Sequence, residues 1–303
     1  MSNIDTASIA FDATVPAPLV NGRPVEVADG VFVIPDGRVP LVPNIGVIVG
    51  DRAALVVDSG LGPQNGAAAH RIARTLAGDR PLFLTLTHFH PEHGFGAQAF
   101  RDATIVYNRT QHDEFRQKAT GYLAQFRGLS AAVAEQLEGV TFVDPHVVYD
   151  GGADLDLGGK LVQLRTWGRA HSRGDQVVFL PAERVLFTGD LVENRFYPIF
   201  PFLPPYDVDV DGNNWITVVA ELQRLDLSIV VPGHGEVGDT GLLDVTHEYL
   251  TFFRSETKRL AAAGKNADHI VATITPQLHT RYPDWDTSEP WRIATGVQTF
   301  LAQ

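Results

Sequence analysis

Short apolar runs rich in valine and isoleucine alternate with turn residues along the first third of the chain. Such runs, bounded by Gly, Pro and Asp, are typical of strands in a meander. Before the last of them, apolar residues recur at the spacing of a helix. The predicted strands are Val25–Ile34, Leu41–Val49, Ala53–Asp58 and Pro81–Thr87, and the predicted helix is Pro63–Leu76.

The rest of the chain repeats this order and then becomes helical. Residues 109–137 are predicted as a helical insertion broken at Gly128, and strands return from Thr141. The later predicted elements are the hairpin Gln176–Leu180 with Arg184–Thr188, a helix over Asn213–Leu225, a strand over Ile229–Val231, and helices near 241–263, 267–279 and 288–302. Strands followed by helices, twice over, predict two sheets packed face to face and covered by helices.

This pattern divides the chain into three parts. Residues 1–24 are polar and aperiodic and are expected to form an N-terminal arm, residues 25–240 form the main domain, and residues 241–303 form a helical extension packed on it. With 44% hydrophobic and 20% charged residues, the composition favours a globular protein over a disordered one.

The charge of the chain excludes some partners. A formal net charge of −12, with no run of Lys and Arg, argues against nucleic acid and anionic membrane surfaces. No apolar stretch approaches the ~18 residues of a membrane-spanning helix, and the N-terminus lacks the basic and apolar parts of a signal peptide. We therefore expect a cytoplasmic protein. A homo-oligomer is compatible with the sequence but is not indicated by it.

The densest candidate chemistry follows the strand predicted at Pro81–Thr87. His88, His90 and His93 lie close together, with Glu92 between the last two. His88 and His90, two apart on an extended turn, can face one ion, while His93 on the opening turn of the next helix can face a second. Because the chain has no cysteine, any metal must be held by His, Asp and Glu, which suits zinc, iron, manganese or cobalt.

Further histidines and aspartates stand at predicted strand ends or in the loops after them, where functional sites are usually built. In chain order, the candidate residues are Asp58, His88-x-His90-x-Glu92-His93, His171, Asp190 and His234. This order resembles that of the metallo-β-lactamase superfamily, over about residues 25–240. The resemblance implies an α/β fold: an αββα sandwich of two mixed β-sheets flanked by helices, with a shallow site at one edge of the paired sheets.

The resemblance also implies ligands for two divalent metal ions, with zinc as the expected metal and iron or manganese as alternatives. His88, His90 and His171 would hold the first ion, His93, His234 and a carboxylate the second, and Asp190 would bridge both. Asp58 would orient a ligand histidine by accepting its other N–H. The alternative for Asp58 is an aspartate that only caps a turn.

Glu92 departs from the family, which normally has Asp at this position. Glutamate is longer by one methylene, so direct ligation of the second ion would require the backbone or the metal to shift by about an ångström. The affinity of the second site would then be lower. Alternatively, Glu92 acts as a base toward metal-bound water.

The loop around His171 also departs from the family. Many relatives have a Pro-Gly-His-Thr-Pro-Gly type of turn, whereas this chain places Arg169 and Arg173 beside the histidine. A guanidinium matches a carboxylate in geometry, so these residues are candidates for binding a substrate carboxylate. The alternative is that they pair with nearby acids of the protein.

The run of residues 195–202, directly after Asp190, is aromatic and rich in proline. We expect it to form a hydrophobic wall beside the metals, with Phe196, Tyr197 and Phe200 as substrate contacts. The hydroxyl of Tyr197 is also a candidate donor to an oxyanion. The alternative for the whole run is ordinary packing against the sheet.

Together these features predict a hydrolase for a small-molecule substrate. A metal-bridging hydroxide, positioned by Asp190, would cleave an ester, lactone or related acyl bond, with Glu92 and Asp58 assisting. The chain has no Gly-x-Ser-x-Gly elbow and no Gly-x-x-x-x-Gly-Lys loop, so the sequence offers no competing motif of those kinds. Two alternatives remain on the same fold: a mononuclear iron oxidoreductase of the sulfur-dioxygenase type, and a catalytically inactive binding protein.

Overall fold

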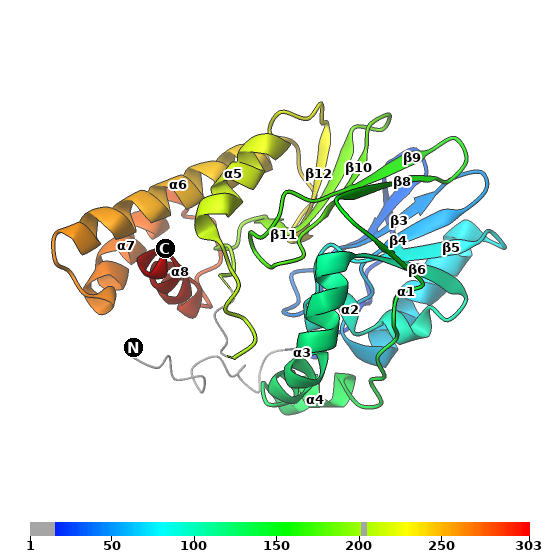
Figure 1. Ribbon diagram of the computed structural model, residues 1–303, viewed down its shortest axis with the longest axis horizontal. Coiled ribbons are helices and arrows are strands. Elements are labelled where there is room, and N and C mark those ends of the chain that lie inside the picture. Colours follow the sequence, from blue (N-terminus) through cyan, green and yellow to red (C-terminus); the bar gives the residue numbers. More distant parts are fainter. Residues whose placement is uncertain (1–15, 201–204) are drawn as a thin grey trace.

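Two β-sheets lie face to face, and a layer of helices covers the outer side of each (Figure 1). The computed structural model describes residues 16–200 and 205–303. This is the αββα sandwich of two mixed sheets that the sequence led us to expect. Within the described residues, no helix is both long enough and apolar enough to cross a membrane.

The larger sheet follows the order of the chain, and the smaller sheet has the order β12-β11-β10-β9-β8. The strands of the larger sheet are β1 (Val25–Ala28), β2 (Val31–Ile34), β3 (Ile45–Val49), β4 (Ala54–Val57), β5 (Leu82–Thr85), β6 (Ala103–Asn108) and β7 (Val147–Tyr149). Those of the smaller sheet are β8 (Gly152–Asp156), β9 (Leu161–Arg165), β10 (Val177–Leu180), β11 (Val185–Glu193) and β12 (Ile229–His234). Strands β4 to β7 are parallel, as are β11 and β12, and the remaining pairs are antiparallel.

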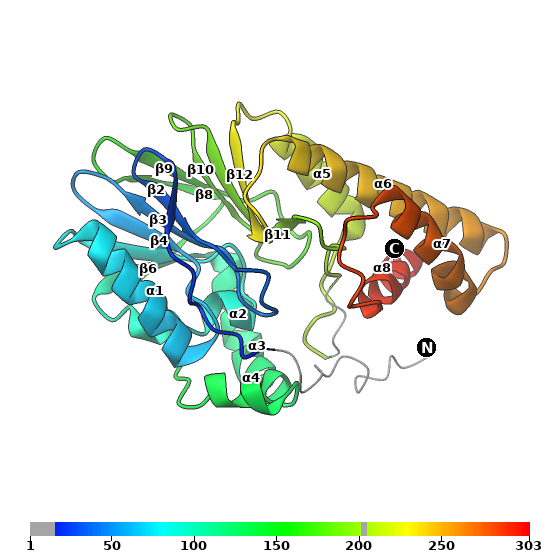
Figure 2. The same cartoon turned by 180° about the vertical axis from the view of Figure 1, so that it is seen from behind.

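The helices form two groups on opposite sides of the sandwich (Figures 1 and 2). They are α1 (Gly62–Ala77), α2 (Pro91–Gly94), α3 (Arg109–Arg127), α4 (Ala131–Gln136), α5 (Gly212–Leu222), α6 (Gly241–Ala262), α7 (Ala267–Arg281) and α8 (Trp291–Ala302), with a short 3-10 turn η2 (Ala97–Ala99). Helices α1, α3 and α4 share a core with the larger sheet. Helices α5 to α8 share another with the smaller sheet, which we call the C-terminal helical layer.

Strand β4 shows why the central strands are apolar at every position. Leu55 and Val57 pack between the two sheets, whereas Ala54 and Val56 pack toward the helices outside the larger sheet. Side chains alternate between the faces of a strand, and both faces are covered here. All four residues of β4 are therefore buried.

The structure corrects two of the predicted elements and adds one strand. The run Val25–Ile34 is two strands rather than one, because the chain turns at Gly30. The φ of this residue is 64°, a left-handed conformation that glycine adopts readily. The strand expected from Leu41 begins only at Ile45, since Leu41 itself has a left-handed φ of 60°. Strand β6 was not predicted at all.

The N-terminal arm is only partly described, because residues 1–15 of the predicted segment lie outside the described residues. From residue 16 to β1 the chain has no regular secondary structure. The amide of Val20 donates to Asn65 in α1 at 2.7 Å, so this part of the arm lies against the larger sheet's helices. The division of the chain into three parts stays a prediction.

Candidate metal centre

The ends of several strands bring the candidate ligands to one edge of the sandwich. Asp58 and His88 follow the parallel strands β4 and β5. Asp190 lies within β11, and His234 ends β12, which runs parallel to β11. His171 lies in the loop between β9 and β10. The carboxyl ends of parallel strands are where α/β folds generally build their sites.

Two groups of four residues could each hold a metal ion, and Asp190 belongs to both. The first group is His88, His90, His171 and Asp190, and the second is Glu92, His93, Asp190 and His234. In each group, one potential ligand atom per residue lies within 4.8 Å of the others. All these residues are buried, and even the most exposed of them, His234, has only 8% of its surface accessible.

The glycine before His234 allows this close approach. A Cβ added at Gly233 would overlap the Asp190 carboxylate and the backbone of β11. The Pro-Gly-His-Gly turn therefore packs directly against the strand that carries Asp190. This contact places His234 Nε2 3.7 Å from Asp190 Oδ2.

The imidazole nitrogens of the first group converge on a single point. His88 Nε2 lies 2.9 Å from His90 Nδ1, which in turn lies 3.3 Å from His171 Nε2. Oδ2 of Asp190 lies 3.8 Å from His88 Nε2 and 3.7 Å from His171 Nε2. In each candidate ligand ring, we call the nitrogen that faces the other ligand atoms the inner nitrogen and the remaining one the outer nitrogen.

The outer nitrogens of three rings face hydrogen-bond acceptors or a hydroxyl. His171 Nδ1 donates to the carbonyl of Ile199 at 3.0 Å, and His93 Nδ1 donates to Asp58 at 2.9 Å. The hydroxyl of Thr87 donates to Asp58 at 3.0 Å and is therefore free to accept from His88 Nδ1, 3.1 Å away. An N–H on the outer nitrogen leaves a lone pair on the inner nitrogen. A metal cation at this point would bind lone pairs that are packed this closely.

Unpartnered buried atoms give a second indication of metal binding. Among the described residues, Glu92 Oε2, His93 Nε2 and both carboxylate oxygens of Asp190 lack a hydrogen-bond partner. His93 Nε2 is 3.3 Å from Asp190 Oδ1, but without the alignment of a hydrogen bond. Leaving such groups unpaired in a protein interior costs about 1–3 kcal/mol each, and more when they are charged. The residues present thus fit a pair of divalent cations.

The pKa values of the histidines differ with their neighbours. Burial lowers the pKa of His88 well below its usual range and that of His171 to about 3. Burial acts on His90 too, but the carboxylates of Asp207, Glu92 and Asp190 together outweigh it and raise the pKa to about 9. Asp190 and Asp58 outweigh burial at His93 in the same way and raise its pKa. His88 and His171 are therefore neutral, the form in which imidazole ligates metals, whereas metal binding would release a proton from His90 and His93.

Residues 38–234, about two thirds of the chain, match the model of the metallo-β-lactamase superfamily. The chain belongs to this superfamily. Its members are mostly metal-dependent hydrolases, which supports an enzyme with bound divalent metal. The resemblance noted in the sequence is thereby confirmed.

Curated relatives of the chain are named for several different activities. The chain is 26% identical over 219 residues to 2,4-dinitroanisole O-demethylase subunit alpha of Nocardioides sp., covering 71% of this chain and 56% of that protein. It is 27% identical over 160 residues to metallo-β-lactamase type 2 of Bacillus cereus, covering 52% of this chain and 53% of that protein. The chain spans about half the length of the curated relatives it matches.

Solved structures share the superfamily fold. A metallo-β-lactamase from Pontibacter korlensis matches with a TM-score of 0.59 at 20% identity, over 76% of this chain and 99% of that one. A stereoselective inverting sec-alkylsulfatase from Pseudomonas sp. matches with a TM-score of 0.71 at 15% identity, over 92% of this chain and 50% of that one. The match to the sulfatase covers 92% of this chain, so it must include at least part of the C-terminal helical layer.

One residue near the superfamily motif was missed by the sequence analysis. Asp207, in the loop before α5, is buried, and its Oδ1 lies 3.4 Å from the outer nitrogen of His90, Nε2. The same oxygen accepts a hydrogen bond from the hydroxyl of Tyr122 in α3. The alternation of aspartates at 207, 209 and 211 is a sequence signal that could have drawn attention to this loop.

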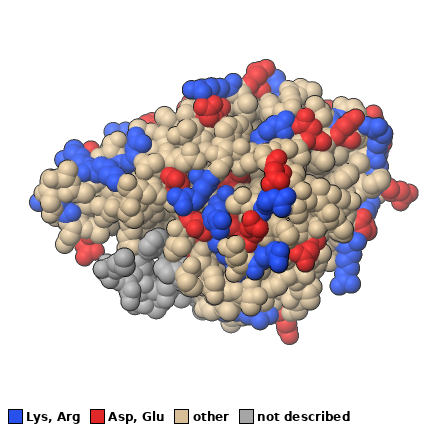
Figure 3. All heavy atoms as spheres, viewed as in Figure 1, with Lys and Arg blue, Asp and Glu red and all other residues tan. Residues whose placement is uncertain are grey.

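The two arginines expected near substrate are paired within the protein. Arg169 forms an ion pair with Asp211 at 3.3 Å, and Arg173 donates to the side-chain oxygen of Gln117 at 3.3 Å. On the face shown in Figure 3, basic and acidic side chains are interspersed rather than gathered by sign. The contact of Arg169 agrees with the pairing alternative, whereas that of Arg173 is to an amide rather than an acid, and a substrate role for either arginine stays a proposal.

The aromatic run after Asp190 contributes largely to the C-terminal helical layer. Tyr197 packs on Trp285 with ring centroids 5.3 Å apart, and Phe200 is buried in the same core. Phe196 is half-buried, and residues 201 and 202 lie outside the described residues. These positions agree with the packing alternative for Tyr197 and Phe200, so their contact with substrate stays a proposal.

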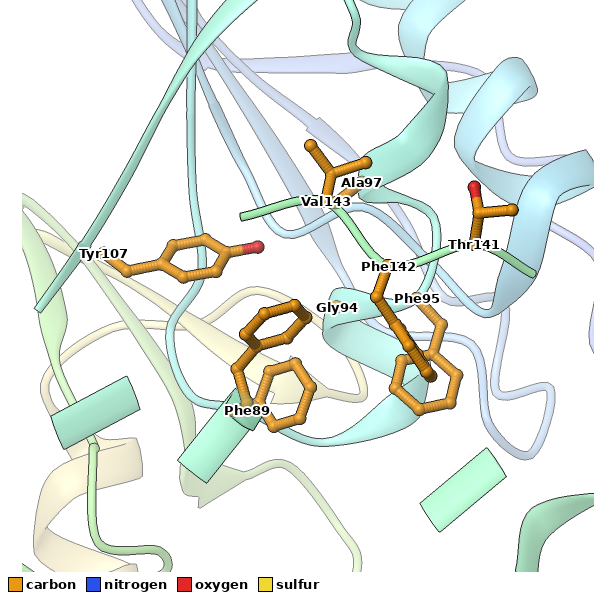
Figure 4. Close-up of a pocket in the computed structure, with 9 residues that line it drawn as sticks. Phe89, Gly94, Phe95, Ala97, Tyr107, Thr141, Phe142 and Val143 are labelled. Atoms are coloured by element: carbon orange, nitrogen blue, oxygen red, sulfur yellow. The ribbon is translucent and has the colours of Figure 1, made fainter. Parts of the chain in front are cut away.

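Phe89, between the first two histidines of the motif, anchors the backbone of this segment. Phe89 lines an apolar hollow between α2, β6 and the loop before β7 (Figure 4). Its neighbours there include Phe95, Phe115 and Phe142. Since side chains alternate along an extended segment, burying Phe89 in this hollow directs the histidines on either side of it toward the metal groups.

Proposed function

We propose that this protein is a hydrolase that binds two divalent metal ions, zinc by expectation, and cleaves an ester, lactone or related acyl bond of a small molecule. The convergence of three inner nitrogens beside a shared, buried Asp190 carries the proposal. His88, His90 and His171 would hold one ion, Glu92, His93 and His234 the other, and Asp190 both. When bound, such ions lower the pKa of water and polarise the bond under attack.

The residues of the chain have distinct tasks in this proposal. Neighbouring histidines outweigh burial and hold the pKa of Asp190 well below its usual range, so its carboxylate stays charged and links the two groups. Asp58 accepts from His93 directly and from His88 through the hydroxyl of Thr87, which keeps both inner nitrogens free. The place of Glu92 in the second group supports a ligand role over that of a base.

The relatives widen the set of substrates worth testing. One is named for an O-demethylase of 2,4-dinitroanisole and another for a sec-alkylsulfatase. The fold alone does not determine which of these bonds the protein cleaves. The panel should therefore contain a chromogenic ester, a lactone, a β-lactam, 2,4-dinitroanisole and a secondary alkyl sulfate.

The test uses the intact chain, stripped of metal with a chelator and then reloaded with zinc. Elemental analysis should give two ions per chain, and ester or lactone hydrolysis should disappear on stripping and return on reloading. The variant His234→Ala should lose the second ion, while His247→Ala, a histidine in α6, should lose neither. Full metal content without turnover of any substrate would favour the inactive binding protein, and one iron per chain with oxygen consumption would favour the oxidoreductase.

A further inference from the structure

Helix α3 presents a row of polar residues to the loops that carry the first metal group. Glu114, Lys118 and Tyr122 are spaced four apart, so they lie on one face of the helix, and all three are buried. Glu114 Oε2 accepts from the amide of Gly174 at 2.9 Å, in the loop that carries His171. Buried polar groups need partners, and this face of α3 finds them in the site loops.

The loop before α5 docks on the same face. Lys118 pairs with Asp209 at 2.8 Å, and the ring of Tyr206 packs on that of Tyr122 with centroids 5.9 Å apart. Gly121 makes room for this contact, since an added Cβ would overlap the ring of Tyr206. Glycine inside a helix costs about 1 kcal/mol relative to alanine. Its presence here accords with a loop that must lie close to α3.

This docking places Asp207 between α3 and His90. Oδ1 of Asp207 lies 3.4 Å from His90 Nε2 and accepts from the Tyr122 hydroxyl. The rings of Tyr122 and His90 also meet edge to face, with centroids 5.9 Å apart. On the other side of the imidazole, Nδ1 lies 2.9 Å from His88 Nε2 and 3.3 Å from His171 Nε2. His90 is therefore held from outside while its inner nitrogen faces the first group.

We propose that Asp207 and Tyr122 are positioning residues that fix the ring orientation and tautomer of His90, and through it the metal affinity of the first group. The inference rests on the proposed function, because it takes His90 as a ligand. A carboxylate only accepts, so in the neutral ring that binds metal an N–H on Nε2 leaves the lone pair on Nδ1. The Tyr122 hydroxyl binds the same carboxylate oxygen and keeps it from turning away. Outer partners of this kind typically change metal affinity by about 10–100-fold.

The test measures zinc affinity of the intact chain by competition with a chromophoric chelator, together with the visible spectrum of the Co²⁺-loaded protein. Asp207→Ala removes the acceptor, so the affinity of the first ion should fall about 10–100-fold and the Co²⁺ spectrum should change. Asp207→Asn keeps an oxygen that can accept from Nε2, so its loss should be smaller. Tyr122→Phe frees the carboxylate and should lower the affinity by about tenfold.

Two matched controls separate positioning from general packing. Asp209→Asn alters the same loop without a contact to His90, and Tyr249→Phe alters a buried tyrosine in the C-terminal helical layer. Tyr249→Phe should bind zinc as the unaltered chain does, and Asp209→Asn should lose less affinity than Asp207→Asn, with thermal unfolding used to check that every variant is folded. If Asp207→Ala does not fold, Asp207→Asn and Tyr122→Phe decide the question.

Two results would overturn the inference while leaving the proposed function intact. One is unchanged first-ion affinity in the folded Asp207 and Tyr122 variants. The other is an equal loss in Asp209→Asn and Asp207→Asn, which would assign the effect to loop docking. An unaltered chain that binds no divalent metal would instead overturn the proposed function itself.

Discussion

The two metal groups share Asp190, but the protein holds their other members in different ways. In the first group, three histidines each face a different outer partner: the Thr87 hydroxyl, the Asp207 carboxylate and the Ile199 carbonyl. These partners come from three separate segments of the chain. In the second group, His93 faces Asp58, while Glu92 adds an oxygen without a hydrogen-bond partner among the described residues.

This difference bears on how each group would bind metal. A site whose ligands are already oriented loses less free energy to ordering when it binds. The first group is oriented from the loop before α5, from the segment after β11 and from the segment after β5. The second depends mainly on Asp58 and on the side chain of Glu92, which is longer than the aspartate expected at this position. We therefore expect the first group to bind its ion more tightly.

The largest expected effect comes from Asp190→Asn, which acts on both groups at once. The substitution removes the negative charge that faces the inner nitrogens and replaces one of two ligand oxygens with an amide. We expect metal content to fall below one ion per chain and kcat/KM on the best substrate to fall by about 10²–10³-fold. Elemental analysis and steady-state rates measure both. Asp226→Asn, an exposed acid paired with Arg184, is the control and should change neither.

Retention of both ions in Asp190→Asn, with activity near that of the unaltered chain, would contradict the shared role of Asp190. It would also remove the basis for comparing two groups, since they would then be independent sites.

Variants of Glu92 sharpen the comparison, because they should affect one group only. Glu92→Gln replaces a carboxylate ligand with an amide, so the affinity of the second ion should fall about 10–100-fold while that of the first is unchanged. Glu92→Asp keeps the charge and shortens the side chain, and should retain the second ion. Stepwise zinc titration measures the two affinities separately. A full metal content with a reduced rate in Glu92→Gln would point to the base role instead.

Much of the fold could be predicted because the chemistry of its elements is local. The β-branched runs, the helical spacing in residues 109–137 and the turn residues between them all indicated the correct type of element. Two of the misjudged places depended on single backbone torsions. At Gly30 one positive φ converts a single apolar run into a hairpin. Strand β6, by contrast, carries the same local pattern as the predicted strands, with Thr104, Ile105 and Val106 in sequence, and could have been predicted.

The residues of the candidate site also differ in how far a local pattern could predict them. The ligand candidates were visible because closely spaced histidines after a strand form a local pattern that is typical of metal binding. Asp207 and Tyr122 were not visible, because they are 85 residues apart and carry no motif. Their importance comes from a loop docking on α3, which is a tertiary contact. The aromatic run after Asp190 illustrates the opposite case, since proximity in sequence suggested a substrate wall and the structure buries Tyr197 and Phe200 in a helical layer.

The smallest expected effect concerns Asp58, which contacts His93 directly and His88 only through the hydroxyl of Thr87. Its φ of 68° is a conformation that asparagine also tolerates, so Asp58→Asn should leave the backbone unchanged. The retained oxygen can still accept from the Thr87 amide, as Oδ1 does now at 2.8 Å. The new NH₂ replaces Oδ2, however, and cannot accept from His93 Nδ1 or from the Thr87 hydroxyl. The affinity of the second ion should therefore fall by about tenfold, because His93 loses the partner that keeps its inner nitrogen unprotonated.

A companion variant separates the two paths that leave Asp58. Thr87→Val removes the hydroxyl that connects Asp58 to His88 but leaves the direct contact between Asp58 and His93 in place. Its effect should fall on the first ion, whereas that of Asp58→Asn should fall mainly on the second. Zinc titration of both variants measures this contrast. If both weakened the same ion, Asp58 would act through one path only, and the separate orientation of the two groups would be contradicted.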